Sequence, residues 1–443
     1  MHVWLMKIGE LPPLEGSGGR LYRTGLIAQA LVDRGHTVTW WNSTLDHARK
    51  KLLYHTDARV ELSRNYTLRL LHSISYSGNI SARRILNHVH VARKFRGYAE
   101  REARPDCIVC CLPTLELCAA AVGYGRRHGV PVVLDIRDLW PDIFLDIAPS
   151  SLRFAARAVL SPYYRMARTA LRGSQGIIGI SEDYLRWGLG YAGRERSPQD
   201  VVFPLGYQRP NVDEKQIAAA GENLTAAGVD INRTICWFVG MFGRTYDLET
   251  VIAAAREAAN SGLHDLQFVL SGAGENYDRL VAQASSLDNV VFTGRIDAPG
   301  LAWMAKQASI GLMAYAKGAP QSLPNKLFEY LCNGLPVLSS LEGETKSLLA
   351  RHHCGLSYAA GDVRNLVVQL GSITRDKVIM REMAVNGAQL FDARYSVEKI
   401  YPELVSYLER VSGQGASCSP EALGQAAQDL HKGASESSMA EPL

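Results

Sequence analysis

Residues 320–336 read PQSLPNKLFEYLCNGLP and contain a short helix with both of its boundaries. Pro324 lies in the first turn of this predicted helix, where proline is favoured because its missing N–H would be unpaired there anyway. Asn333 and Gly334 end the helix, and an apolar strand follows over residues 336–339. The stretch therefore predicts a helix that begins at a turn and leads directly into a buried strand.

Two charged side chains on this helix indicate what it binds. The exposed N–H groups at a helix start attract anions, and Lys326 adds a full positive charge beside them. Glu329, one turn further along, is placed to accept hydrogen bonds from sugar hydroxyls. A phosphate contact and a hydroxyl contact on one helix indicate a nucleotide. The alternative is an ordinary amphipathic helix with a Lys–Glu pair three residues apart.

Strand and helix patterns alternate along most of the chain, in two series. The first series has apolar strands over residues 2–8, 37–41, 107–112, 131–136, 176–180 and 201–203. The second has strands over residues 234–240, 266–271, 290–292, 310–314 and 336–339. Repeated βαβ units form parallel sheets covered by helices on both faces, so the pattern predicts two doubly wound, Rossmann-like α/β domains that face a cleft.

The domain boundaries follow from this alternation and from the turn-rich segment between the two series. We expect a first domain over residues 1–203, a hinge over 204–210 and a second domain over 211–390. Residues 391–412 are predicted as a terminal helical segment. Residues 413–443 are rich in Ser, Ala and Gly, and we expect them to be a disordered tail.

Composition limits the class of protein. The chain has 443 residues, 47% of them hydrophobic, and a formal net charge of +4, which fits an ordinary globular protein. Its longest apolar run, over residues 107–123, is interrupted by Pro113 and Glu116, so no membrane span is expected. Residues 1–7 lack the basic start of a signal peptide and are predicted to lead directly into a strand, so no signal peptide is expected. Cys107 and Cys110 lie in this run and are interpreted as buried strand thiols of a cytoplasmic protein rather than as metal ligands.

Basic residues are concentrated in two stretches. Thirteen Lys or Arg residues lie between positions 49 and 104, and five Arg residues lie among apolar and aromatic residues over 153–172. Arginine alternating with Phe154, Tyr163 and Tyr164 at helical spacing predicts peripheral docking on the inner, anionic face of the cytoplasmic membrane. A solvated face on an ordinary core helix is the alternative. No nucleic-acid-binding motif accompanies the charge.

The motif from Ser322 to Tyr330, S-L-P-x-K-x-F-E-Y, resembles the donor-binding helix of the retaining glycosyltransferases of family 4. It is most similar to the bacterial subgroup of amino-sugar transferase-like enzymes that build O-antigen and capsule. The resemblance implies the GT-B fold, with the final helix crossing back to the first domain. It also implies a UDP-sugar donor, a polyprenyl-diphosphate-linked or glycan acceptor, and a retaining reaction without a metal or other cofactor.

The same resemblance implies roles for individual residues. Arg137, Asp138 and Glu329 are the expected catalytic residues, with Arg137 and Asp138 holding the donor sugar and the acceptor. Contacts to the donor are expected from Arg244, Gly272, Gly274, Arg295, Ile296, Pro324, Asn325, Lys326, Leu327 and Glu329. The loop after the first strand resembles the family's glycine loop, and Gly18, Gly19 and Arg20 are expected there to face phosphate and acceptor.

The chain also departs from the family pattern. Arg137 stands where many members have His, and a guanidinium does not transfer protons near neutral pH. Gln321 replaces the first acid of the E-x7-E motif. In the glycine loop around Gly240, Met241 and Asp247 stand where the family usually has Arg and Lys. Arg244 and Lys326 are therefore the candidates for holding the diphosphate. Two rival functions remain open: a UDP-sugar 2-epimerase with the same fold, and a non-catalytic protein that binds sugar nucleotides.

Overall fold

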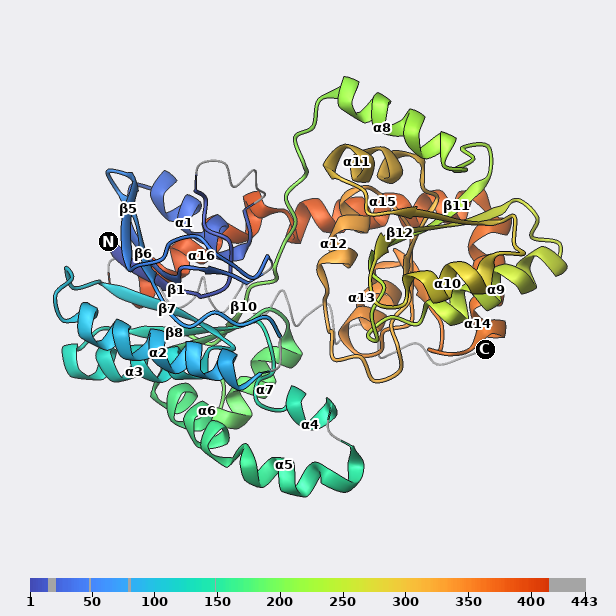
Figure 1. Ribbon diagram of the computed structural model, residues 1–443. Coiled ribbons are helices and arrows are strands. Elements are labelled where there is room, and N and C mark those ends of the chain that lie inside the picture. Colours follow the sequence, from blue (N-terminus) through green and yellow to red (C-terminus); the bar gives the residue numbers. More distant parts are fainter. Residues whose placement is uncertain (15–20, 48, 79–80, 148, 414–443) are drawn as a thin grey trace, which may run out of the picture.

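The computed structural model describes residues 1–14, 21–47, 49–78, 81–147 and 149–413. It contains two large sheets, each with helices on both faces (Figure 1). The chain crosses between the two domains twice, once in each direction. The predicted class, two Rossmann-like α/β domains, is confirmed. Apolar strands that are buried on both faces, such as the CIVCCL segment of β7, explain why the sheets are almost entirely parallel.

The first sheet has eight strands, and all neighbouring pairs are parallel except the one at its last edge. In spatial order the strands are β10 (Val201–Val202), β9 (Gly176–Gly179), β8 (Val132–Ile136), β7 (Cys107–Leu112), β1 (His2–Met6), β2 (Thr37–Ser43), β6 (Tyr66–Leu71) and β5 (Ala58–Ser63). The edge pair β5 and β6 is antiparallel and was not predicted, since this part of the sequence was interpreted only as a basic stretch.

Seven helices, a short 3-10 turn and a small ribbon complete the first domain. The helices are α1 (Arg23–Asp33), α2 (Ala82–Ala99), α3 (Leu115–His128), α4 (Ile143–Ile147), α5 (Arg153–Val159), α6 (Ser161–Gly173) and α7 (Glu182–Ala192). The turn is η1 (Ser150–Leu152), and the ribbon pairs β3 (Leu45–Asp46) with β4 (Lys51–Leu52). The first turn of α1 is held by the Glu10 carboxylate, which accepts from the N–H of Thr24.

The second sheet has six strands, all parallel. In spatial order they are β13 (Val290–Gly294), β12 (Leu266–Ala273), β11 (Thr234–Met241), β14 (Ile310–Met313), β15 (Val337–Ser339) and β16 (Gly355–Ser357). The helices are α8 (Glu214–Ala226), α9 (Leu248–Asn260), α10 (Tyr277–Ala284), α11 (Ala298–Gln307), α12 (Asn325–Cys332), α13 (Glu344–His352), α14 (Val363–Arg375), α15 (Lys377–Arg394) and α16 (Val397–Val411).

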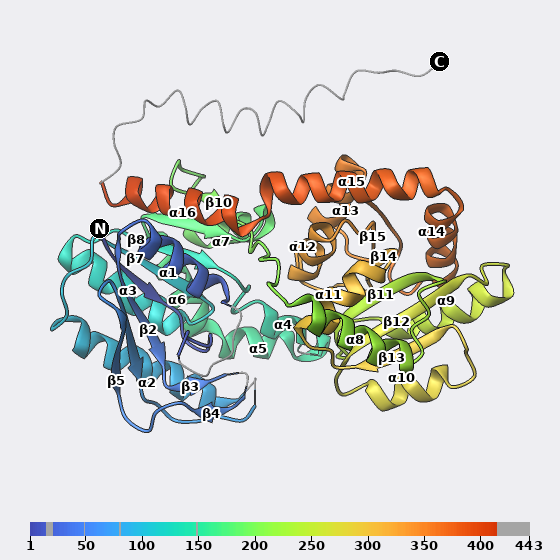
Figure 2. The same cartoon turned by 90° about the horizontal axis from the view of Figure 1, so that it is seen from above.

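The last two helices lie almost in line along one side of the molecule (Figure 2). Helix α15 packs against α12 of the second domain, whereas α16 packs against α1 of the first. Ile400, Tyr401 and Leu404 of α16 are buried in one cluster with strand residues such as Leu5 and Trp40. The N–H of Tyr207 donates to the carbonyl of Tyr395 at 3.1 Å, so the two crossings lie side by side.

The two domains also touch where α7 and α13 begin. The Glu344 carboxylate of α13 accepts hydrogen bonds from the backbone N–H groups of Asp183 at 2.6 Å and Glu182 at 3.2 Å. These are unpaired groups at the start of α7, and a carboxylate there is favoured by the helix dipole. The Ser322 hydroxyl is 3.0 Å from Glu344 and 3.2 Å from Asp183. A side chain of one domain therefore caps a helix of the other.

Candidate functional site

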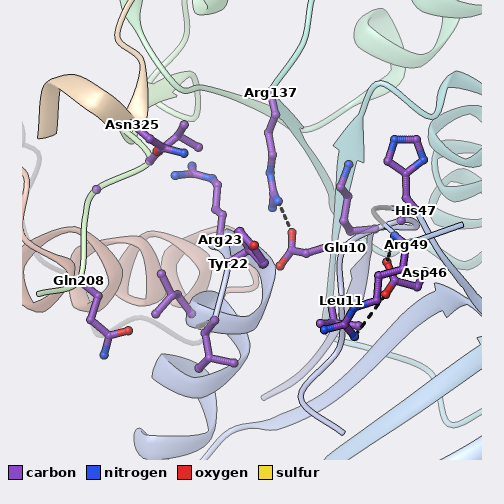
Figure 3. A pocket seen from close by; sticks show the side chains of 16 residues that line it. Glu10, Leu11, Tyr22, Arg23, Asp46, His47, Arg49, Arg137, Gln208 and Asn325 are labelled. Carbon is purple, nitrogen blue, oxygen red and sulfur yellow. Dashed lines mark hydrogen bonds and ion pairs between the residues drawn. The ribbon is translucent and has the colours of Figure 1, made fainter. Parts of the chain in front are cut away.

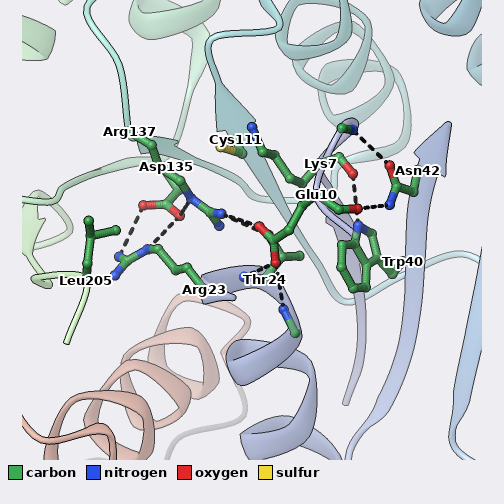
Figure 4. Close-up of polar contacts among 12 residues, drawn as sticks. Lys7, Glu10, Arg23, Thr24, Trp40, Asn42, Cys111, Asp135, Arg137 and Leu205 are labelled. Atoms are coloured by element: carbon green, nitrogen blue, oxygen red, sulfur yellow. Dashed lines mark hydrogen bonds and ion pairs between the residues drawn. The ribbon is translucent and has the colours of Figure 1, made fainter. Parts of the chain in front are cut away.

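A network of buried charges lies at the carboxyl ends of β1 and β8 (Figure 4). Arg23 donates to both oxygens of Asp135, at 3.0 and 3.2 Å, and to the carbonyl of Pro204 at 2.7 Å. Arg137 donates to Asp135 at 2.7 Å and to Glu10 at 2.9 Å. The network thus fixes Arg137 from two sides and ties the start of the hinge to the first domain.

Glu10 joins this network to helix α1. Its carboxylate accepts from the backbone N–H groups of Thr24 at 2.8 Å and Gly25 at 3.0 Å, which are unpaired donors of the first helical turn. It also accepts from the Thr24 hydroxyl at 2.8 Å. The Asn42 amide donates to the Glu10 carbonyl at 2.7 Å and holds this segment against β2. The start of α1 therefore points its N–H groups at a carboxylate that is already shared with Arg137.

Electrostatics keeps Asp135 ionised in spite of complete burial. Burial alone would raise the pKa of Asp135, but the charges and hydrogen bonds of Arg23 and Arg137 outweigh it and lower the pKa to about 2. Arg137 is therefore a fixed positive charge at the edge of the sheet. Its guanidinium can hold an oxygen of a ligand, and it does not act as an acid or base.

Asp138, the next residue, lies in a different environment. Its carboxylate accepts from the N–H of Leu139 at 2.9 Å and faces the positive charges of Lys7 and Arg84. Burial raises the pKa of Asp138, and these neighbours offset the rise only in part.

A cavity of about 420 Å³ lies between the first domain, the hinge and the start of α12. Figure 3 shows Asn325 and Gln208 at one side of it and His47 and Arg49 at the other, with Arg137 between them. The structure therefore brings one expected catalytic residue and one expected donor residue, Arg137 and Asn325, to the same cavity.

Lys326 of α12 is buried in a cage of aromatic rings. Its ammonium nitrogen lies 3.7 Å from the centre of the Phe238 ring and 4.3 Å from that of Tyr246. Among the described residues it has no hydrogen-bond partner. Burial lowers the pKa of Lys326 well below its ordinary value, and Glu329 raises it only in part. A Cβ on Gly240 would lie 2.7 Å from this nitrogen, so glycine leaves the approach from β11 open.

The other residues of α12 divide between core and surface. Pro324 caps the helix and Asn325 is exposed at its start, whereas Leu327 is fully buried in the core. Glu329 is half-buried, and the Tyr207 hydroxyl of the hinge donates to it at 3.3 Å. Because its side chain is buried, Leu327 could contact a ligand only through its main chain. Its N–H already donates to the Pro324 carbonyl at 3.0 Å.

The two glycines expected near the donor are required by backbone packing. A Cβ on Gly272 would lie 1.8 Å from the carbonyl oxygen of Gly240, and one on Gly274 would lie 2.6 Å from that of Phe242. A side chain at Gly272 would separate β12 from β11, and one at Gly274 would push the segment after β12 away from the loop after β11. These glycines can serve a ligand, but their packing alone accounts for them.

The remaining expected donor residues lie on the surface. The Arg244 side chain is 91% exposed, lies 3.4 Å from Glu275 and lines a second cavity of about 490 Å³ beside Tyr246. Arg295 is exposed and Ile296 half-buried in the turn after β13. Gly18, Gly19 and Arg20 lie outside the described residues.

Sequence reasoning missed Glu10, Arg23 and Asp135, the partners of Arg137. One signal was present, since Asp135 interrupts the apolar strand VVLDI, and a carboxylate there needs a partner. Within the described chain, no group of three or more His, Cys, Asp or Glu side chains could hold a metal ion. Seven cysteines of the described chain are buried and form no disulfide bond. Cys107 and Cys110 are among them, and their burial confirms the interpretation as buried strand thiols.

Comparisons with known proteins agree with this architecture. Residues 233–376 match the family described as Glycosyl transferases group 1. No curated protein sequence matches the chain. Sucrose-phosphate synthase from Thermosynechococcus elongatus superimposes with a TM-score of 0.67 at 18% identity, covering 93% of this chain and 98% of that one.

Two further solved structures are similar over the same share of the chain. HepE from Anabaena, in complex with UDP-glucose, has a TM-score of 0.62 at 16% identity, covering 93% of this chain and 100% of its own. WaaG, a glycosyltransferase involved in lipopolysaccharide biosynthesis, has a TM-score of 0.61 at 15% identity with the same coverage. The chain therefore has the GT-B fold, and residues 233–376 in its second domain are similar to the group 1 glycosyl transferases.

Proposed function

We propose that the protein is a retaining glycosyltransferase that moves a sugar from a UDP-sugar to a lipid-linked or glycan acceptor in bacterial cell-surface polysaccharide synthesis. The group 1 domain over residues 233–376 and the GT-B fold support the class of enzyme. HepE, whose structures contain UDP, glucose and UDP-glucose, supports the choice of donor. The sequence motif over Ser322–Tyr330 supports the pathway.

The observation that carries the proposal is the caged ammonium of Lys326. A buried cation without a hydrogen-bond acceptor is costly, and the rings of Phe238 and Tyr246 offset only part of that cost. The β-phosphate of a UDP-sugar beside Gly240 would supply the missing negative charge. Glu329, one turn along α12, would then accept hydrogen bonds from hydroxyl groups of the same ligand.

This arrangement predicts that UDP binding is coupled to proton uptake at pH values near or above the lowered pKa of Lys326. Because burial lowers the pKa of Lys326, a bound diphosphate should raise that pKa again and draw a proton from solution. Calorimetry of UDP binding in buffers of different ionisation enthalpy measures the uptake. We expect uptake in the wild type and its loss in Lys326→Met, together with weaker UDP binding and little change for uridine.

Lys306→Met is the matched control. Lys306 is an exposed lysine on α11, and its ammonium lies 2.9 Å from the carboxylate of Glu214. It should leave both affinity and proton uptake unchanged. Equal losses for UDP and uridine in Lys326→Met would show that Lys326 does not contact phosphate.

In the proposed reaction the acceptor oxygen attacks the anomeric carbon on the face from which the diphosphate leaves. The anomeric C–O bond breaks, its electron pair goes to the diphosphate, and the acceptor proton moves to a diphosphate oxygen. Lys326 and Arg244, both in the second domain, are proposed to stabilise the charge that develops there. Arg137 and Asp138 hold the donor sugar and the acceptor in place.

Turnover of a donor separates this proposal from its rivals. A screen of UDP- and GDP-sugars by thermal shift, followed by product analysis, should find a donor that releases UDP when an acceptor is present. An isomerised UDP-sugar would indicate the 2-epimerase, and binding without turnover would indicate a non-catalytic protein. Because side chains and helix termini are proposed to hold the diphosphate, activity should also survive excess EDTA.

We further propose that the first domain docks on an anionic membrane surface. Within the described part of the chain, no helix combines the length and apolar character needed to cross a bilayer. Helix α5 instead has no buried residue, and Leu152, Phe154 and Val159 are 56%, 88% and 78% exposed. Five exposed arginines lie on α5 and the following helix α6: Arg153, Arg157, Arg165, Arg168 and Arg172. Exposed apolar side chains together with arginines suit the interface of an anionic bilayer, where a lipid-linked acceptor would lie.

A further inference from the structure

A further cavity lies in the first domain, beside helix α1 and the edge strands β5 and β6 of the first sheet. Its volume is about 820 Å³, and small-molecule sites typically measure roughly 300–1,000 Å³. Gln29 and Val32 of α1 line it, as do Val60 and Leu62 of β5. We call this space the side cavity.

The side cavity adjoins the cavity of about 420 Å³ that Arg137 lines, which we call the central cavity. Two residues, Leu11 and Arg49, line both cavities. The Arg49 side chain is 61% exposed and lies 3.7 Å from the Asp46 carboxylate. One elongated ligand can therefore occupy both cavities, with one end in the central cavity and the other in the side cavity.

Tyr66 brings a buried polar group without a partner to the side cavity. The residue is 6% exposed, and among the described residues its hydroxyl has no hydrogen-bond partner. A buried hydroxyl is costly until another group pairs with it. Burial, followed by the charge of Glu10, raises the pKa of Tyr66, so the hydroxyl keeps its proton and can both donate and accept. A neutral ligand that carries hydroxyl groups would supply the missing partner.

The rest of the lining combines apolar surface with polar groups near solvent. Tyr54 is half-buried, whereas Gln29 and Glu61 are exposed. The Gln29 amide donates to Asp33 at 2.6 Å, which leaves its oxygen as an acceptor. One Glu61 oxygen lies 3.1 Å from Arg59, and the other is left to accept a hydrogen bond. A sugar ring has apolar C–H faces and a rim of hydroxyl groups, so its surface matches both parts of this lining.

We propose that the side cavity binds a saccharide unit of the acceptor, next to the unit that reacts in the central cavity. An aliphatic or prenyl chain would leave the Tyr66 hydroxyl unpaired. Helix α5, proposed to face the membrane, packs against α4 and α6 on the other face of the first sheet, far from α1 and β5 (Figure 1). The inference rests on the proposed function only for naming the saccharide as the acceptor.

The test uses the full chain with UDP in excess and three disaccharide probes: maltose, cellobiose and N,N′-diacetylchitobiose. Titration by saturation-transfer difference NMR should show that at least one disaccharide binds more tightly than its monosaccharide. Tyr66→Phe should weaken that binding roughly three- to tenfold, the loss expected for one neutral hydrogen bond. Gln29→Trp places a large ring in the side cavity and should weaken it further. Arg93→Trp, at an exposed position of α2, is the matched control and should bind normally.

Thermal stability gives a second readout, which a structural role of the Tyr66 hydroxyl would not produce. Because this hydroxyl is unpaired in the free protein, Tyr66→Phe should keep or raise Tm while it weakens disaccharide binding. Tyr98→Phe should do the reverse, since the Tyr98 hydroxyl donates to Asp57 at 2.9 Å. A lower Tm in Tyr66→Phe, or equal disaccharide binding by this variant and the wild type, would overturn the proposal.

Two further outcomes would also overturn it. One is the absence of binding by all three disaccharides. The other is tighter binding of farnesol than of any disaccharide, increased further in Tyr66→Phe, which would assign the side cavity to an apolar chain. The result is separable from that of the proposed function, because UDP binding and turnover are measured independently. Disaccharide binding in a protein that does not bind UDP would keep the saccharide site and remove the transferase proposal.

Discussion

At the scale of single residues, Asp135 holds the first half of the site together. It is fully buried and accepts hydrogen bonds from two arginines, Arg23 and Arg137. Asp135→Asn keeps the shape of the side chain but leaves the largely buried Arg137 with Glu10 and the buried Arg23 with the carbonyl of Pro204. Breaking such a buried network typically costs about 3–5 kcal/mol of unfolding free energy. Urea unfolding should show a loss of that size.

The control for this prediction is Asp288→Asn, an exposed aspartate in the second domain, which should change stability by less than about 0.5 kcal/mol. The pH dependence gives a further check. Because the folded-state pKa of Asp135 lies below its ordinary value, its stabilisation is present above pH 3.8 and is lost as the pH falls toward 2. The asparagine variant should lack this part of the acid dependence.

Glu329 gives the second prediction at this scale. Glu329→Ala removes the carboxylate proposed to hold ligand hydroxyls, and losing one charged hydrogen bond costs about 1.5–3 kcal/mol. Calorimetry should therefore show UDP affinity reduced roughly ten- to a hundredfold, with the thermal transition little changed. The hydroxyl of Tyr207 is its neighbour at 3.3 Å, and Tyr207→Phe should have a smaller effect. Unchanged UDP affinity in Glu329→Ala would remove Glu329 from the site.

How far the site could be predicted depends on sequence distance. Lys326 and Glu329 could be found because helix boundaries and charge spacing are local properties of one motif. The aromatic cage could not, since Phe238 comes from β11 and Tyr246 from the loop after it. Likewise, Glu10 and Arg137 are 127 positions apart, and only the parallel order of β1, β7 and β8 brings them together.

At the scale of elements, the proposed docking on a membrane surface depends on helix α5. The sequence indicated Phe154, Tyr163 and Tyr164 as the apolar contacts with the membrane. For the buried Tyr164 this is wrong, whereas Tyr163 is half-buried. Tyr164 is buried with its hydroxyl 2.9 Å from Asp142, and Tyr163 donates to Glu116 at 2.8 Å. Helical spacing alone could not separate these residues from Phe154, because the partners of both tyrosines lie outside the basic stretch.

The corrected surface predicts which residues govern membrane binding. Phe154→Ser with Val159→Ser should reduce sedimentation with phosphatidylglycerol vesicles while leaving the folded domain stable, because neither side chain is buried. Binding should also require anionic lipid and fall with added salt. Val378→Ser is the control, an exposed apolar residue on α15. Equal recovery in the supernatant with anionic and neutral vesicles, at low and high salt, would contradict the docking proposal.

At the scale of the whole molecule, the fold was predictable because βαβ alternation leaves little choice of architecture, whereas contacts between the domains were not. The cap of α7 by Glu344 is one such contact.

Glu344→Ala leaves the N–H groups of Glu182 and Asp183 without this acceptor, so their hydrogen exchange should accelerate about tenfold or more. Glu342→Ala, an exposed neighbour paired with Lys346, is the control. Unchanged exchange at Asp183 would mean that the contact does not restrain the domains.

The return of α16 to the first domain has a consequence for the order in which the chain folds during synthesis. The ribosome completes the strands of the first sheet long before it makes Ile400, Tyr401 and Leu404, which cover part of that sheet's core. Until then, the apolar surface formed by residues such as Ile27 and Trp40 is not covered by α16. The nascent first domain therefore exposes a surface of the kind that chaperones bind. The second domain, made later, can finish before the first. The N-terminal half of the protein is thus the last to become native.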